Sequence, residues 1–224
     1  MLRRHFVLVE HAPWRVVAIP VLQDNFVFVV AHGSDAMVID AGAALPVLHY
    51  LREQNMTIRQ VLLTHQHRDH TAGYAELLAQ VAPASVLAGE EIEMLSLPGH
   101  TAEDVGYYFA GARVVCTGDC LINGACGRVL GGRLENLYRS VQLLKALPGD
   151  TRILGGHDYL VDNLHFALQY QPDNAAIHAR LARYASDPAG ALFATLAEEL
   201  ATNPFLQAED FTAFAALRAA KDRY

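Results

Sequence analysis

The sequence predicts an α/β domain followed by a smaller, all-helical region. Up to about residue 159, short β-branched strands alternate with amphipathic helices, and beyond it only helical patterns occur. The 224 residues are 52% hydrophobic, which is enough to bury a core in one large domain or in one large and one small domain. We therefore place one domain at residues 1–159 and a second, helical domain at residues 160–224.

The predicted strands of the first domain are short, apolar and separated by turn residues. They cover residues 16–20, 25–31, 36–40, 60–64, 85–88, 92–97, 105–109, 113–117 and 151–154. Between them, residues 44–54 and 73–81 are expected to be helical. Residues 134–147 form the clearest amphipathic helix, because apolar side chains recur there every three or four positions.

Four helices are expected in the second domain, with cap residues and prolines between them. They cover residues 160–170, 174–185, 189–200 and 210–222. Asn174 and Asp210 have the short polar side chains that favour helix N-caps. Pro188 and Pro204 follow Asp187 and Asn203, and such pairs separate helices.

Charge and cysteine content exclude several classes of protein. The net charge of −7 is wrong for a nucleic-acid binder, and an anionic substrate would need a local cationic patch. We expect no signal peptide, because charged residues interrupt the N-terminal apolar run, and no apolar run is long enough to span a membrane. Three cysteines cannot all pair with one another, so a cytoplasmic location is expected.

A dense group of potential metal ligands follows the predicted strand 60–64. His65, His67, Asp69 and His70 lie within six residues, and such a cluster has no packing use at a strand end. An isolated histidine at a strand end is usually only hydrogen-bonded, so the cluster carries the argument. Single ligand-type residues follow four other predicted strands, and these are Asp40, His100, Asp119 and His157.

The combination of imidazole and carboxylate side chains suits zinc, iron or manganese and argues against calcium. Four histidines and two aspartates exceed what one tetrahedral ion needs. Two ions that share a bridging carboxylate would use them all. We expect two divalent ions, with zinc as the first choice and iron or manganese as alternatives.

The order of these motifs resembles that of the metallo-β-lactamase superfamily. The resemblance implies an αββα sandwich and assigns His65, His67 and His100 to one metal ion. It assigns Asp69, His70 and His157 to the second ion, with Asp119 as the bridge. Asp40 matches an aspartate that orients a ligand in the family without binding metal. Catalysis is expected to depend most on three of these residues, namely His67, Asp69 and Asp119.

Other segments resemble glyoxalase II, the hydroxyacylglutathione hydrolase family, over nearly the whole chain. They are Cys126-Gly127-Arg128, Asp158-Tyr159, 163–167, Pro172-Asp173-Asn174, 202–206 and 218–222. The resemblance implies a thioester hydrolase that cleaves S-(2-hydroxyacyl)glutathione with a hydroxide bridging the two ions. It also implies that Arg128, Tyr159, Arg218 and Lys221 bind the glutathione moiety. Arg218 and Lys221 can face the same way, because they are three positions apart on one predicted helix.

Two alternatives remain open on the sequence. His157-Asp158-Tyr159 also resembles the persulfide dioxygenases, which are iron enzymes that share the Cys-Gly-Arg segment but lack the C-terminal helical motifs. Leu130 stands where glyoxalase II carries an aromatic residue, which leaves a different esterase or lactonase of the same fold as the second alternative. The expected partner is a small glutathione thioester, with neither nucleic acid nor membrane, and the chain is expected to be a monomer or small homo-oligomer.

Overall fold

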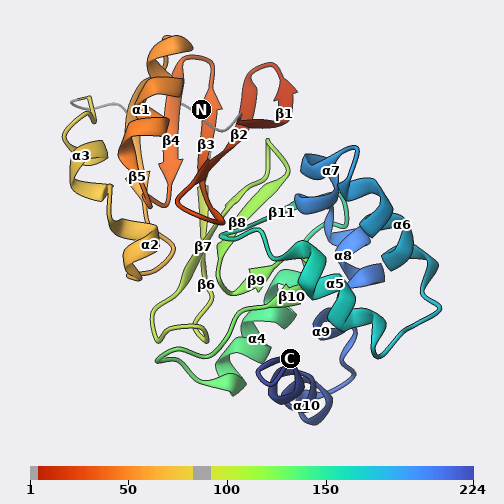
Figure 1. Cartoon of the computed structure of the whole chain (residues 1–224). Helices are drawn as coiled ribbons and strands as arrows, with labels where there is room; N and C mark the ends of the chain where they lie inside the picture. Colours follow the sequence, from red (N-terminus) through yellow and green to blue (C-terminus); the bar gives the residue numbers. More distant parts are fainter. Residues whose placement is uncertain (1–4, 83–91) are drawn as a thin grey trace.

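Two β-sheets packed face to face form the centre of the protein, and helices cover both outer faces (Figure 1). The computed structural model describes residues 5–82 and 92–224. The first sheet has the order β1-β2-β3-β4-β5, and these strands are β1 Phe6–His11, β2 Trp14–Val21, β3 Asn25–His32, β4 Asp35–Ile39 and β5 Thr57–Leu62. Neighbouring strands are antiparallel except for the parallel pair β4 and β5.

The second sheet has the order β11-β8-β7-β6, and its strands β11 and β8 are parallel. These strands are β6 Ile92–Ser96, β7 Val105–Phe109, β8 Val114–Gly118 and β11 Arg152–Gly155. A two-stranded ribbon of β9 Leu121–Ile122 and β10 Ala125–Cys126 follows β8. Within the described residues, the protein therefore contains two mixed sheets and one short two-stranded ribbon.

Alternation along β3 shows why the sheets form a sandwich. Phe28 and Val30 point into the core between the two sheets, whereas Val27 and Val29 point to the opposite face, which the helices cover. On that face lie α1 Ala44–Glu53 and α3 Tyr74–Leu78, and α4 Leu134–Lys145 covers the outer face of the second sheet. This arrangement confirms the predicted αββα sandwich.

The C-terminal part of the chain is helical, as predicted, and packs beside the second sheet (Figure 1). Its helices are α5 Leu160–Leu168, α6 Ala175–Tyr184, α7 Pro188–Leu192, α8 Leu196–Thr202, α9 Pro204–Gln207 and α10 Phe211–Lys221. Leu164 and Ile177 lie in the same buried cluster as Phe28 of the first sheet and Val114 of the second. The helices thus share a core with both sheets, and the division at residue 159 stays a prediction.

The predicted helix at 189–200 is wrong, because the chain leaves the helix between α7 and α8. The Ile153 N–H donates to the Ala194 carbonyl over 3.0 Å, and the Leu196 N–H donates to the Thr151 carbonyl over 2.7 Å. These bonds pair the chain with the edge of β11. The Thr195 hydroxyl then caps α8 by accepting from the Glu198 N–H.

Smaller differences concern element ends. β5 stops at Leu62 instead of reaching Thr64, because the Thr64 N–H donates to the Asp40 carboxylate instead of a neighbouring strand. The helix predicted at 73–81 is shorter, and α2 Arg68–Thr71 precedes it. The sequence did not indicate β1, β9, β10 or α9. The strand predicted at 85–88 lies outside the described residues.

No helix within residues 5–82 or 92–224 combines the length and apolar character needed to cross a membrane.

Helices α4 and α10 pack on each other through aromatic side chains. The rings of Tyr138 and Phe214 meet edge-on, with centroids 5.3 Å apart. This contact packs the C-terminal helix against α4, which covers the second sheet.

A fully buried ion pair ties the helical region to the β9–β10 ribbon. Glu199 in α8 accepts from Arg180 Nη2 over 2.5 Å and from the backbone N–H of Gly124 over 3.0 Å. Asn203 also donates to Glu199 over 3.0 Å, and Arg180 donates to the Ala191 carbonyl over 2.8 Å. All three of these contacts of the carboxylate are hydrogen-bond donors, which compensates its charge.

We predict that Glu199→Gln destabilises the protein by about 3–5 kcal/mol, because it leaves the buried Arg180 charge without its partner. Urea unfolding at equilibrium measures this change. The matched control is Glu198→Gln, whose partner Arg183 is 39% exposed. That variant should lose no more than about 1 kcal/mol. Equal stability of the two variants would contradict the role assigned to the buried pair.

Candidate metal centre and substrate cavity

The candidate ligands converge because five strands end at the same edge of the sandwich. Asp40 follows β4, His65 follows β5 by three residues, and His100 follows β6 by four. Asp119 follows β8, and His157 follows β11 by two residues. Side chains just beyond strand ends are positioned by the sheet and still free to face a ligand. The structure brings together all seven predicted metal ligands.

The first group of ligands contains His65, His67 and His100. Nδ1 of His67 lies 3.0 Å from Nε2 of His65 and 2.9 Å from Nε2 of His100. Two nitrogens bound to one tetrahedral zinc ion at about 2.0–2.1 Å would lie about 3.3 Å apart. The three rings therefore present their nitrogens at nearly the spacing that a shared ion requires.

The second group contains Asp69, His70 and His157. Nε2 of His70 and Nε2 of His157 are 3.3 Å apart, and Oδ2 of Asp69 lies 3.6 Å and 3.4 Å from these two atoms. In both groups the ligand atoms lie within 4.8 Å of one another. Each group therefore fits one divalent ion.

Asp119 lies between the two groups. Its Oδ2 is 3.6 Å from Nε2 of His100 and 3.3 Å from Nε2 of His157. Its Oδ1 is buried and accepts no hydrogen bond from any residue that the structure describes, although Nε2 of His70 lies 3.5 Å away. A buried carboxylate oxygen without a donor is costly unless a cation lies beside it. This oxygen is the clearest sign that the site holds divalent metal.

The outer nitrogen of each buried imidazole has its own partner. Nδ1 of His70 is 2.9 Å from Oδ2 of Asp40, as expected for an aspartate that orients a ligand. Nδ1 of His100 donates to the Arg128 carbonyl over 2.7 Å, and Nδ1 of His65 is 3.1 Å from the Thr64 hydroxyl. These contacts hold the opposite nitrogen of each ring toward the metal centre.

The outer partner of His157 was not found from the sequence. Nδ1 of His157 lies 2.9 Å from Oδ1 of Asp24, in the turn between β2 and β3. The next residue, Asn25, donates from Nδ2 to Oδ2 of Asp69 over 2.8 Å. Asp and Asn are ordinary turn residues, so their position before β3 gave no signal of this role.

Burial and charge together set the protonation of the cluster. Burial by itself would lower the pKa of His70, but the Asp40 charge and hydrogen bond raise that pKa to about 9. Burial lowers the pKa of His65 to about 4, and the charge of His70 adds to this effect. Burial opposes ionisation of Asp119, but a hydrogen bond from His157 and the charge of His70 keep its pKa low. Metal binding would therefore displace a proton from His70.

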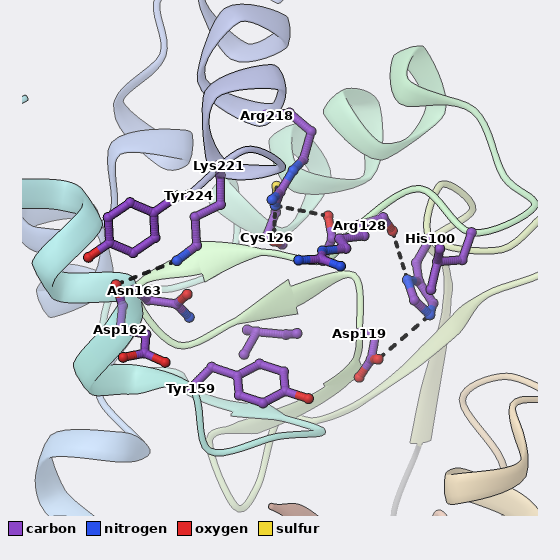
Figure 2. A pocket seen from close by; sticks show the side chains of 13 residues that line it. His100, Asp119, Cys126, Arg128, Tyr159, Asp162, Asn163, Arg218, Lys221 and Tyr224 are labelled. Atoms are coloured by element: carbon purple, nitrogen blue, oxygen red, sulfur yellow. Dashed lines mark hydrogen bonds and ion pairs between the residues drawn. The ribbon is translucent and has the colours of Figure 1, made fainter.

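A cavity of about 700 Å³ opens directly from the metal centre (Figure 2). His100 and Asp119 form its metal end. The other residues that line it are Ile122, Cys126, Gly127, Arg128, Leu130, Tyr159, Asp162, Asn163, Arg218, Lys221 and Tyr224. All four predicted substrate contacts are among them, so residues more than 90 positions apart in the sequence meet in one cavity.

The two arginines of the cavity differ in what they can bind. Arg218 is buried, and it donates to the Cys126 carbonyl over 2.7 Å and pairs with Asp222 at 3.0 Å. The side chain of Arg128 is 68% exposed, and its Nε lies 3.9 Å from Oδ1 of Asp222, a distant partner. Arg128 is thus free to meet an anion, whereas Arg218 holds the loop that carries Arg128.

Lys221 and Tyr159 lie on either side of the cavity (Figure 2). The ammonium group of Lys221 lies 4.8 Å from the ring centroid of Tyr224. Burial, together with the charge of Arg218, lowers the pKa of Lys221 to about 8. The Tyr159 ring stacks on His157 at 4.9 Å with an interplanar angle of 9°. This stacking connects the cavity wall to the second ligand group.

The fold and the metal ligands define a class of protein. A family model for the metallo-β-lactamase superfamily matches residues 20–97. The structure resembles that of ETHE1 from Myxococcus xanthus, with a TM-score of 0.64, 22% identity, and 88% and 86% of the two chains covered. It also resembles the BLEG-1 B3 metallo-β-lactamase, with a TM-score of 0.57, 16% identity, and 91% and 99% covered. The protein has the metallo-β-lactamase fold.

Closer relatives define the family within that class. A family model for the hydroxyacylglutathione hydrolase C-terminus matches residues 158–224. The hydroxyacylglutathione hydrolase of Acidiphilium cryptum is 36% identical, with 96% of this chain and 99% of the relative covered. That of Haemophilus ducreyi is 33% identical, with 94% and 99% covered. The chain belongs to the hydroxyacylglutathione hydrolase family, glyoxalase II.

We predict that Gly156→Ala removes most of the bound metal. A Cβ at residue 156 would lie 2.6 Å from Oδ1 of Asp119 and 2.6 Å from Cε1 of His70, so two candidate ligands would have to move. Metal analysis of the purified variant by mass spectrometry measures the loss. The control is Gly149→Ala, where a Cβ would come no closer than 3.7 Å to Ala197. Full metal content in Gly156→Ala would refute this account of the close approach.

Proposed function

We propose that this protein hydrolyses S-(2-hydroxyacyl)glutathione thioesters, such as S-D-lactoylglutathione, to glutathione and a 2-hydroxy acid. One observation carries the proposal. The metal centre opens through His100 and Asp119 into a cavity that the cations Arg128 and Lys221 also line. In a chain of net charge −7, this is the local cationic patch that the two carboxylates of a glutathione moiety need.

We further propose that the centre holds two divalent ions, with zinc as the expected metal. His65, His67 and His100 would hold one ion, whereas Asp69, His70 and His157 would hold the other, with Asp119 between them. When bound, such ions polarise a carbonyl oxygen and lower the pKa of water toward neutrality. The mixed nitrogen and oxygen donors also suit iron and manganese.

The chain itself binds and orients the substrate. Arg128 and Lys221 would pair with the glutathione carboxylates, and the Tyr159 hydroxyl would donate a hydrogen bond to the same moiety. Arg218 would act indirectly, since its hydrogen bond to the Cys126 carbonyl holds the loop that carries Arg128. Binding at the far end of the cavity would bring the thioester carbonyl to the metal end. A thiolate leaves with little need for protonation, so this reaction requires no dedicated general acid.

Two other functions remain testable. A persulfide dioxygenase would share the fold and the Cys126-Gly127-Arg128 segment, but the match of residues 158–224 to the hydroxyacylglutathione hydrolase C-terminus favours the hydrolase. A lactonase or another esterase would not need cations in the cavity. We also propose a cytoplasmic location, supported by three buried free cysteines.

The test of the proposed function is steady-state hydrolysis of S-D-lactoylglutathione against a panel of oxygen esters, lactones and a β-lactam. We expect the thioester to have the highest kcat/KM. His67→Ala should lose most of the activity together with the ion of its own ligand group, and Asp119→Ala should lose most of the activity together with bound metal, because each removes a candidate ligand. Oxygen consumption with glutathione persulfide would instead identify the dioxygenase. A fully active, metal-free variant at either position would reject the proposed mechanism.

The cationic end of the cavity predicts a pH dependence of binding. With its pKa lowered to about 8, Lys221 is charged below pH 8 and loses its charge as the pH rises through that value. KM for the glutathione thioester should therefore rise above pH 8. Lys221→Met should raise KM by about tenfold at pH 7, since it removes one charge-assisted contact. Its KM should no longer change around pH 8.

The matched control for this prediction is Lys145→Met. Lys145 lies at the end of α4 and is not among the residues that line the cavity. Its replacement should leave both KM and the pH profile unchanged. A wild-type KM that stays constant between pH 7 and pH 9 would show that the Lys221 charge does not bind substrate.

A further inference from the structure

The turn between β2 and β3 reaches into the metal centre from the first sheet. β2 ends at Val21 and β3 begins at Asn25, and Leu22 between them has a positive φ of 51°. Backbone hydrogen bonds join the turn and the start of β3 to the segment that carries His157. The Phe26 N–H donates to the Gly156 carbonyl over 2.9 Å, and the Asp158 N–H donates to the Asp24 carbonyl over 2.8 Å.

These backbone contacts bring two side chains to the second ligand group. Oδ1 of Asp24 lies 2.9 Å from Nδ1 of His157. With Nδ1 donating to Asp24, Nε2 is the ring nitrogen left for a metal ion once it gives up its own proton, and it lies 3.3 Å from Asp119 and 3.4 Å from Nδ2 of Asn25. Asn25 donates to Oδ2 of Asp69 over 2.8 Å and thereby fixes the rotation of a second candidate ligand.

The two ligand groups differ in the partners behind them. In the Asp69–His70–His157 group, both imidazoles have an aspartate behind them, since Asp40 contacts His70 and Asp24 contacts His157. In the other group, the buried rings of His65 and His100 contact a hydroxyl and a backbone carbonyl, which are neutral acceptors. Carboxylate partners raise the basicity of an imidazole ligand more than neutral partners do.

We propose that Asp24 and Asn25 are positioning residues that determine the metal affinity of the Asp69–His70–His157 position without binding the ion. The inference rests on the proposed two-ion function. Asp24 fixes the tautomer and orientation of His157, while Asn25 fixes Asp69. Removing either contact should therefore weaken the binding of the ion at Asp69, His70 and His157. The binding of the ion at His65, His67 and His100 should stay unchanged.

The experiment is a metal titration of the full-length apoprotein with zinc, in competition with a chromophoric chelator. Wild-type protein should bind two ions. Asp24→Ala should weaken one of the two binding constants by about 10–100-fold, as loss of a carboxylate behind a histidine ligand does elsewhere. Asp24→Asn keeps an oxygen that can accept from Nδ1, so its loss should be smaller. Asn25→Ala should weaken the same constant as Asp24→Ala.

Two controls separate positioning from charge and from folding. Asp162→Asn removes a carboxylate that lines a second cavity together with Asp24 but has no hydrogen bond to a ligand, so both constants should stay unchanged. In a His67→Ala background, the single remaining ion should show the full effect of Asp24→Ala. Thermal unfolding of each apoprotein checks folding, and the isosteric Asp24→Asn serves if Asp24→Ala does not fold.

The outcomes are distinct. If both binding constants are unchanged in Asp24→Ala, the positioning role is overturned and the proposed function stays intact. If Asp24→Ala does not fold, unchanged constants in Asp24→Asn and Asn25→Ala have the same meaning. An equal loss in Asp162→Asn would also overturn it, because general charge would then explain the effect. Fewer than two ions bound to the wild-type protein would overturn the two-ion site and this inference together.

Discussion

Each buried histidine of the metal centre must point the lone pair of one ring nitrogen toward the metal position. The arrangement of the strand ends and loops around the centre depends on this constraint. The constraint is met by fixing the outer nitrogen of each ring. Asp40 makes one contact of this kind and also joins two strand ends. Its carboxylate accepts from the Thr64 N–H over 2.8 Å and lies 2.9 Å from His70, while its own N–H donates to the Leu62 carbonyl. One buried aspartate thus joins the ends of β4 and β5 to a candidate ligand, and it does so with a positive φ of 63°, which aspartate tolerates better than most residues.

The segment that carries Arg128 links the metal centre to the substrate cavity. The carbonyl of Arg128 holds His100, while the side chain of Arg128 faces the cavity. Arg218 in α10 bonds to the Cys126 carbonyl at the start of this segment. The C-terminal helix therefore acts on the metal end of the cavity through one loop. Because the helices also share a core with both sheets, the cavity forms only when the whole chain has folded.

The sequence located residues whose chemistry is unusual for their position. The cluster from His65 to His70 was visible because four ligand-type side chains in six residues have no packing use. Asp24 and Asn25 were not, because a polar pair before a strand is what any turn contains. Arg218 was predicted to bind the substrate and does line the cavity, but a basic residue in a helix does not reveal whether backbone carbonyls already use its donors. The break at Phe193 was missed because its cause is the edge of β11.

By itself, the sequence determined an α/β domain with a helical C-terminal region and the metal-binding chemistry, because strand and helix patterns and ligand clustering are local properties. The sandwich was implied by the resemblance of the motif order to the metallo-β-lactamase superfamily. The tertiary structure alone decided which side chains stand behind the ligands and which cation is free to meet a substrate. Asp24 and His157 are 133 residues apart, and Arg218 and Cys126 are 92 apart. Contacts over such separations depend on strand order and on the packing of helices against sheets, and no pattern within a segment records them.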